Sequence, residues 1–79
     1  MQIERDLRVK EMHVEVQQRL GYVGRTTFYE WRKALGFTTP PYSYAHLEAV
    51  AAFGRFMLAG CDTNTALAKS RQWLEQQGN

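Results

Sequence analysis

A chain of 79 residues with 44% hydrophobic and 23% charged side chains fits one folded domain, and this composition excludes disordered and collagen-like proteins. A single cysteine, Cys61, excludes an internal disulfide, and no zinc-site spacing of Cys and His is present, so we expect neither a metal nor a cofactor. No signal peptide or membrane-length apolar run is found, so we expect a cytoplasmic protein without a membrane partner.

The first predicted element is an amphipathic helix over residues 10–20. Its apolar positions recur every four residues and are Met12, Val16 and Leu20. Gly21 follows at the place where a residue in the left-handed conformation commonly ends a helix. The preceding residues, 1–9, match neither helical nor strand periodicity, and we leave an arm, a short strand and an early helical turn open there.

A second amphipathic helix is predicted over residues 25–35, after a turn at 22–24, and Gly36 ends it. Its apolar positions are Phe28, Trp31 and Leu35. Two helices joined by so short a glycine-bearing turn are typical of the helix-turn-helix motif. We therefore interpret residues 10–36 as a helix-turn-helix.

Residues 37–42 contain adjacent prolines and cannot be helical, so we expect a connector or a reduced β wing there. The following segment, 43–77, is predicted to hold a third and a fourth helix. Ser43 is the expected N-cap of the third helix and Gly60 its end.

The fourth helix is predicted over about 64–77, with Asp62 or Thr63 as its cap. Two aromatic residues of the third helix, Phe53 and Phe56, lie off its main apolar stripe. Two interpretations remain open for them. They are packed by the fourth helix or the N-terminal arm, or they form an apolar patch that contacts a second copy or another protein.

The second helix also has a polar side opposite its apolar positions. At 100° per residue this side carries hydroxyl, phenol, carboxylate and amine groups, with arginines on its flank. Such groups suit base edges in the major groove and phosphate oxygens, and the start of a helix favours an anion. The stretch from Arg19 to Lys33 has a local net charge of +3. The candidate DNA-contacting residues are Arg19, Arg25, Thr26, Thr27, Tyr29, Glu30, Arg32 and Lys33.

Other interpretations of the same residues are weaker or opposed. A polar helix face is often only a solvated surface, and Glu30 would repel phosphates, although it could accept from a cytosine amine. His13 and Glu15 form an H-x-E pair, but the P-C-x-x-C of zinc deaminases does not follow. No nucleophile, base and acid are grouped in the sequence, so we expect no catalytic residues and no enzyme activity.

The run VGRTTFYEWRKALGF resembles the V-S-x-x-T-hydrophobic-x-x-Trp/Tyr-x-x-x-Gly-hydrophobic pattern of helix-turn-helix proteins of the MerR (mercury-resistance regulator) type. Tyr42-Ser43 and the later FMLAGCDTNTALAKSRQWL are similar to that family's next segments, so the resemblance covers about 12–75. It implies a winged helix-turn-helix that binds duplex DNA in the bacterial nucleoid, with the second helix in the major groove. The positions that match the recognition helix are Arg25, Thr26, Thr27 and Tyr29, and those that match its end are Arg32 and Lys33.

The sequence departs from that pattern in three places. The turn is one residue longer if Gly21 is the turn glycine, so that either Tyr22 bulges or Gly24 takes the capping place of the serine. The wing is reduced to residues 38–41 and has no cation. No ligand-binding tail of the family's kind follows, so no small-molecule effector is assigned.

We therefore expect one mainly all-α domain over residues 1–79, a four-helix winged helix-turn-helix of MerR-like type with a minimal β wing. The expected function is that of a small sequence-specific DNA-binding protein that regulates transcription, with double-stranded DNA as its partner and possible self-association or cooperative assembly on DNA. An excisionase-like factor that bends DNA is one alternative. A protein-interaction adaptor that kept the helical scaffold without DNA binding is the other.

Overall fold

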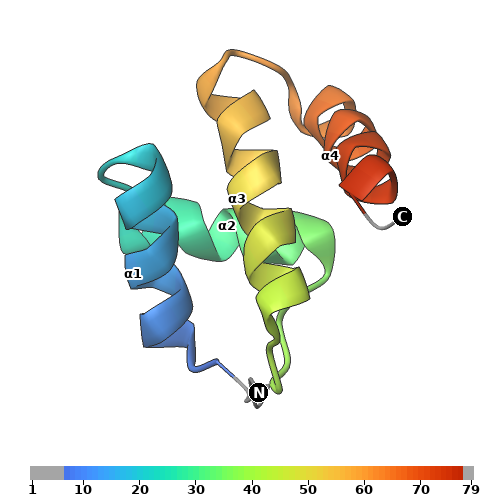
Figure 1. Ribbon diagram of the computed structural model, residues 1–79. Helices are drawn as coiled ribbons and strands as arrows, with labels where there is room; N and C mark the ends of the chain where they lie inside the picture. The colour runs from blue at the N-terminus through green and yellow to red at the C-terminus, as the bar shows by residue number, and fades with distance from the viewer. Residues whose placement is uncertain (1–6, 78–79) are drawn as a thin grey trace.

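The computed structural model describes residues 7–77, and in this part the protein is mainly helical (Figure 1). Its four helices are α1 (Val9–Leu20), α2 (Arg25–Leu35), α3 (Tyr44–Leu58) and α4 (Thr63–Gln77). The predicted second helix is confirmed in full, and the other three begin or end within two residues of their predicted bounds. Most of the segment for which we left an arm or strand open, residues 1–6, lies outside the described residues. None of these helices is long and apolar enough to cross a membrane.

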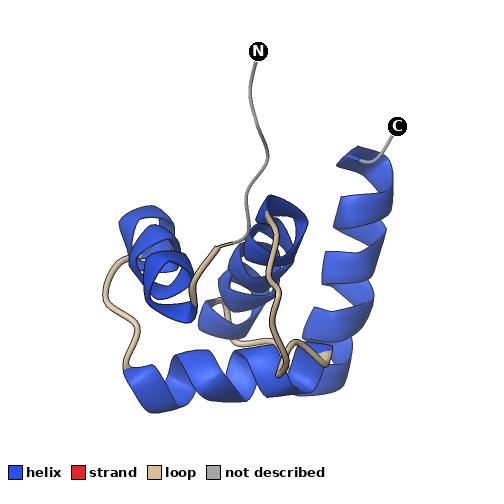
Figure 2. Cartoon of the chain, turned by 90° about the horizontal axis from the view of Figure 1, so that it is seen from below, coloured by secondary structure: helices blue, strands red, loops and turns tan. Residues whose placement is uncertain are grey.

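In Figure 1, α2 crosses behind α1 and α3, and in Figure 2 it lies beneath these two helices while α4 stands at its right-hand end. The centre of the molecule is α3, which packs against each of the other helices. The residues predicted to anchor α2 do face inward: Phe28 and Trp31 are only 2% and 5% exposed, and Leu35 is half-buried against the same core. One side of α2 therefore supports the fold while the other side faces away from it.

Local capping groups explain where the helices begin and end. The Ser43 side chain accepts a hydrogen bond from the backbone amide of His46 at the start of α3, as predicted. At the end of α2, Gly36 has φ 83° and ψ 14°, the left-handed conformation that glycine adopts without strain. Gly21 after α1 has φ 91° but ψ −171°, so the predicted left-handed helical cap is wrong there. Its positive φ still favours glycine, but its ψ lies outside the left-handed helical region.

The connector at 37–42 forms no ribbon of its own. Tyr42 makes an isolated antiparallel bridge with Leu7, whose amide donates to the Tyr42 carbonyl oxygen at 2.7 Å. Within residues 7–77 this isolated bridge is the only β-structure, and no β-strand is formed. Both bridge residues are buried, so the connector is fixed to the core although it lacks a sheet.

The interpretation of Phe53 as a surface contact is wrong. Its side chain is 1% exposed and meets Trp31 edge to face, with ring centroids 6.5 Å apart. Phe56 is half-buried, and the Nζ of Lys69 from α4 lies 5.9 Å from its ring centroid. Phe56 thus follows the other interpretation, in which the fourth helix packs against it, whereas the ring contact of Phe53 is with α2.

Candidate nucleic-acid interface

The outward side of α2 keeps its polar groups exposed. They are Arg25, Thr26, Thr27, Tyr29, Glu30 and Lys33. Tyr29 is 45% exposed despite its large ring. We call these six residues the polar face of α2. The start of α4 borders this face at Thr63 but does not bury any of the six residues.

A groove runs along one edge of the polar face, between α2, α3 and α4. Its rim carries residues of the polar face, namely Thr26, Thr27, Glu30 and Lys33, together with Thr63 at the start of α4. Its floor is apolar and is formed by Trp31, Ala34, Phe53 and Met57. Hydrogen-bonding groups therefore stand above an apolar base, a mixture that can contact both polar edges and methyl groups of a partner.

The prediction that Arg32 lies on the flank of α2 is wrong. Arg32 is 8% exposed, and its Nη1 donates to the Tyr42 hydroxyl at 3.0 Å and to the Phe37 carbonyl at 3.3 Å. Its guanidinium carbon also lies 5.2 Å from the ring centroid of Phe28 and 5.7 Å from that of Tyr42. These contacts are of the cation–π kind. Arg32 thus fastens the end of α2 to the connector and is not available to hold phosphate.

Arg19 is also separated from the polar face. It forms an ion pair with Glu48 of α3 and lines a pocket together with Ala51 and Ala52. The groove beside α2 is instead lined by Phe53 and other residues of α3, so the pocket and the groove lie on different sides of that helix. The structure does not bring Arg19 together with the residues of α2 as predicted.

Without these two arginines, the polar face carries less charge than the sequence indicated. Its cations are Arg25 and Lys33, and its one anion is Glu30, which leaves a net charge of +1. The first turn of α2 contains no acidic residue, so the positive end of the helix dipole is not opposed by a neighbouring carboxylate of the same helix.

The turn before α2 is held by two α1 side chains, Gln17 and His13, whose contact with the turn the sequence did not predict. The Val23 amide donates to Gln17 Oε1 at 3.1 Å, and the Val23 carbonyl accepts from His13 Nε2 at 2.6 Å. The His13 ring also stacks on Phe28, with centroids 4.6 Å apart and planes 16° apart. Val23 is buried, so both of its backbone polar groups need such partners. This clamp fixes the angle at which α2 leaves α1.

Tyr22 is a further candidate that the sequence analysis did not place in the site. The extra turn residue is accommodated in both of the ways left open, since Tyr22 projects with 88% exposure and Gly24 is the N-cap of α2. The Tyr22 hydroxyl would lie 3.6 Å from a Cβ at Gly24, close to the start of the helix. An aromatic residue between two turn glycines is the sequence signal that could have indicated it.

Comparisons of this chain with models of known protein families, with curated proteins and with solved structures found no match. The resemblance to the MerR type therefore stays a prediction based on residue pattern. What is known of the candidate interface is its geometry: an exposed polar helix face, an apolar-floored groove beside it, and a clamped turn in front of it.

Proposed function

We propose that the protein binds double-stranded DNA sequence-specifically, with α2 in the major groove, in the manner of a small MerR-like winged helix-turn-helix regulator of transcription. The observation that carries this proposal is the position of α2. Its apolar side is buried at Phe28 and Trp31, while its polar face is exposed on the side of the helix that points away from the core. A helix presented in this way can enter the major groove without rearrangement of the domain.

Under this proposal, the residues of the polar face have two roles. Thr26, Tyr29 and Glu30 point away from the core around the helix and are suited to base edges, whereas the exposed amine of Lys33 is suited to a phosphate. Arg25 stands at the first residue of α2, where the helix dipole and backbone amides favour a phosphate. Tyr22 lies close enough to the same helix start to donate its hydroxyl to that phosphate.

A reduced wing belongs to the same proposal. The connector contains the buried Tyr42, and its threonines and prolines at 38–41 are exposed and uncharged. It could touch the DNA backbone through hydroxyl groups but supplies no cation of its own. We therefore expect modest affinity for each domain and a gain from two copies bound side by side.

A protein-interaction adaptor is the second candidate. The net charge of +1 on the polar face and the apolar floor of the adjacent groove favour it. A protein partner would place an apolar side chain in this groove against the half-buried Ala34 and Met57, whereas duplex DNA would mainly contact the rim.

The test is a fluorescence-anisotropy titration with duplex DNA at low salt, followed by selection of bound duplexes from a random pool. Lys33→Gln should weaken binding to all duplexes by a similar factor, whereas Thr26→Ala should change the selected sequences. Arg71→Gln is the matched control, because Arg71 is an exposed arginine on α4 outside the polar face. It should leave binding unchanged.

Absence of binding at tens of micromolar protein would reject the proposal, since even non-specific binding lies at about 10⁻⁴–10⁻⁶ M at physiological salt and is tighter at low salt. Equal losses for Lys33→Gln and Arg71→Gln would also reject it, because they would indicate general charge attraction without a defined face. Reversed effects of Lys33→Gln and Thr26→Ala would reject the roles assigned to these two residues.

A further inference from the structure

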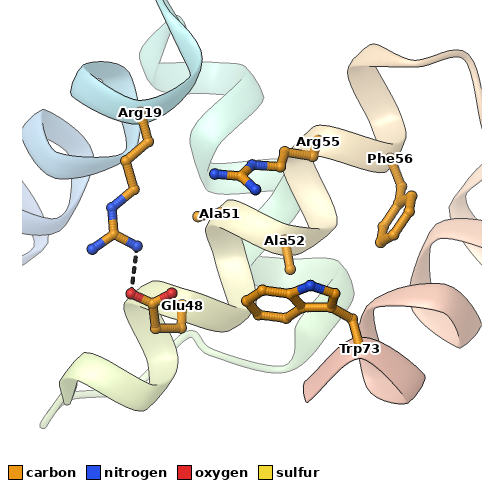
Figure 3. Close-up of a pocket in the computed structure, with 7 residues that line it drawn as sticks. All are labelled: Arg19, Glu48, Ala51, Ala52, Arg55, Phe56 and Trp73. Carbon is orange, nitrogen blue, oxygen red and sulfur yellow. Dashed lines mark hydrogen bonds and ion pairs between the residues drawn. The ribbon is translucent and has the colours of Figure 1, made fainter. Parts of the chain in front are cut away.

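A second hollow lies away from the polar face, where α1, α3 and α4 meet (Figure 3). Ala51 and Ala52 of α3 form its floor, and the rings of Trp73 and Phe56 stand at its sides. Arg19, Glu48 and Arg55 reach into it from the rim. We call this hollow the Trp73 pocket. The small alanine side chains leave room that a larger residue at either position would fill.

The polar groups of the Trp73 pocket are mostly hydrogen-bond donors. Glu48 is its one carboxylate, and that carboxylate already accepts from the guanidinium of Arg19. Among the described residues, the side chain of Arg55 has no hydrogen-bond or ion-pair partner, although its carbonyl oxygen accepts from the Ala59 amide, and its guanidinium extends over the alanine floor (Figure 3). The indole N–H of Trp73 is a further donor. The balance of charge on the rim is +1, so an anionic ligand is favoured.

The size of the pocket limits what it can hold. Its volume is about 250 Å³, whereas an engineered apolar cavity of about 150 Å³ is sufficient for benzene. One or two fused rings therefore fit, but a helix or an extended peptide does not. An apolar pocket with a few convergent polar groups is the usual form of a small-molecule site.

We propose that the Trp73 pocket binds a small planar aromatic carboxylate. The ring lies against Trp73 and the alanine floor, and the carboxylate accepts hydrogen bonds from Arg55. Flat apolar walls select the ring by offset stacking, and the guanidinium fork selects the carboxylate by paired hydrogen bonds. This site is independent of the polar face of α2 and does not depend on DNA binding.

The test uses 1-naphthoate as the probe and follows the two indole N–H signals of the ¹⁵N-labelled full chain by NMR. Trp73→Phe assigns them. Naphthoate should shift the Trp73 signal saturably at a concentration of about 1 mM or below, while the signal of the buried Trp31 stays in place. The neutral isostere 1-naphthamide should bind at least about fivefold more weakly, because it lacks the charge that Arg55 recognises.

Arg55→Gln should remove the difference between naphthoate and naphthamide, and Arg71→Gln, a matched arginine outside the pocket, should preserve it. An unchanged Trp31 signal shows that each variant is folded. Three outcomes would overturn the proposal: no saturable shift at about 10 mM, equal affinity for both probes in the parent chain, or a Trp73 signal that moves with protein concentration alone. The last would assign the pocket to contact between copies.

Discussion

At the scale of single residues, the start of α4 depends on one carboxylate. Asp62 Oδ1 accepts from the Thr65 backbone amide at 2.7 Å, and this bond, aided by one from the Thr65 side chain, lowers the pKa of Asp62 below its ordinary 3.8. Folding therefore favours the ionised form. The resulting stabilisation is fully present above the unfolded-state pKa and is lost as the pH falls through the lower, folded-state pKa.

Asp62→Asn should consequently flatten the acid side of the stability profile. Asparagine can still cap the helix but has no proton to bind in this range. We expect the fall in Tm between about pH 5 and pH 2 to be smaller in this variant than in the parent chain, as measured by circular dichroism during heating. Asp62→Ala removes the helix cap together with the titratable group, so this variant should have a lower Tm than the parent chain even at neutral pH. An acid profile of Asp62→Asn parallel to that of the parent would contradict this role.

Arg32 and Arg19 show why individual site residues were harder to predict than the face they were assigned to. At 100° per residue, helical periodicity places Arg25 and Arg32 on the solvent-facing flanks of α2. In the structure, however, Arg32 is covered by Tyr42, which lies ten residues away in the sequence. Arg19 is similarly engaged by Glu48 from another helix. These partners belong to tertiary packing, which periodicity within one helix cannot reveal. The exposed positions of Thr26 and Lys33 follow from α2 alone and were predicted correctly.

At the scale of elements, the packing of α2 against α3 leaves no room for a side chain at Gly54. A Cβ at this position would lie 2.5 Å from Trp31 Cζ3 and 2.8 Å from Leu20 Cδ1. Real Cβ atoms do not come so close, so the glycine is required by the crossing of the helices. Helical periodicity puts Gly54 on the same side of α3 as the buried Leu47 and Val50, but it gives no information on that crossing.

Gly54→Ala tests the close approach because two effects oppose each other. Alanine is better than glycine in a helix interior by about 1 kcal/mol, whereas overpacking a core costs about 1–3 kcal/mol. Since the obstructing atom belongs to the buried ring of Trp31, we expect overpacking to prevail and urea unfolding to show a loss of up to about 2 kcal/mol. Ala68→Gly on the exposed side of α4 measures the propensity term alone. A Gly54→Ala protein more stable than the parent would show that the helices can move apart.

The helices themselves were predictable because their signals are local. Ser43, Gly36 and Asp62 mark three helix ends by side-chain or backbone chemistry that acts within a few residues. The clamp of His13 and Gln17 on Val23 was missed, since it joins positions six and ten residues apart through side chains that have no distinctive pattern. The connector differed from the predicted wing for a similar reason. Its one bridge among the described residues is made with Leu7, which is distant in sequence.

At the scale of the whole molecule, the small charge of the polar face sets the salt dependence of the proposed DNA binding. With Arg25 and Lys33 as its phosphate contacts, log affinity should fall with log salt at a slope of about −2 for each bound domain. Two domains on one site would give about −4. Anisotropy titrations across a salt series measure this slope, and Lys33→Gln should reduce it by about 1. A slope near zero for DNA binding would contradict Arg25 and Lys33 as phosphate contacts.

The Leu7–Tyr42 bridge has a practical consequence for anyone who handles this protein. Tyr42 holds both the bridge and the hydroxyl that accepts from Arg32, so a pull on the chain just before Leu7 is transmitted through two hydrogen bonds to the end of α2. A bulky tag or a surface linkage attached before Leu7 would therefore strain α2. Attachment after Gln77 would instead apply the force to α4, whose contacts are mainly with α3, and would leave the packing of α2 undisturbed.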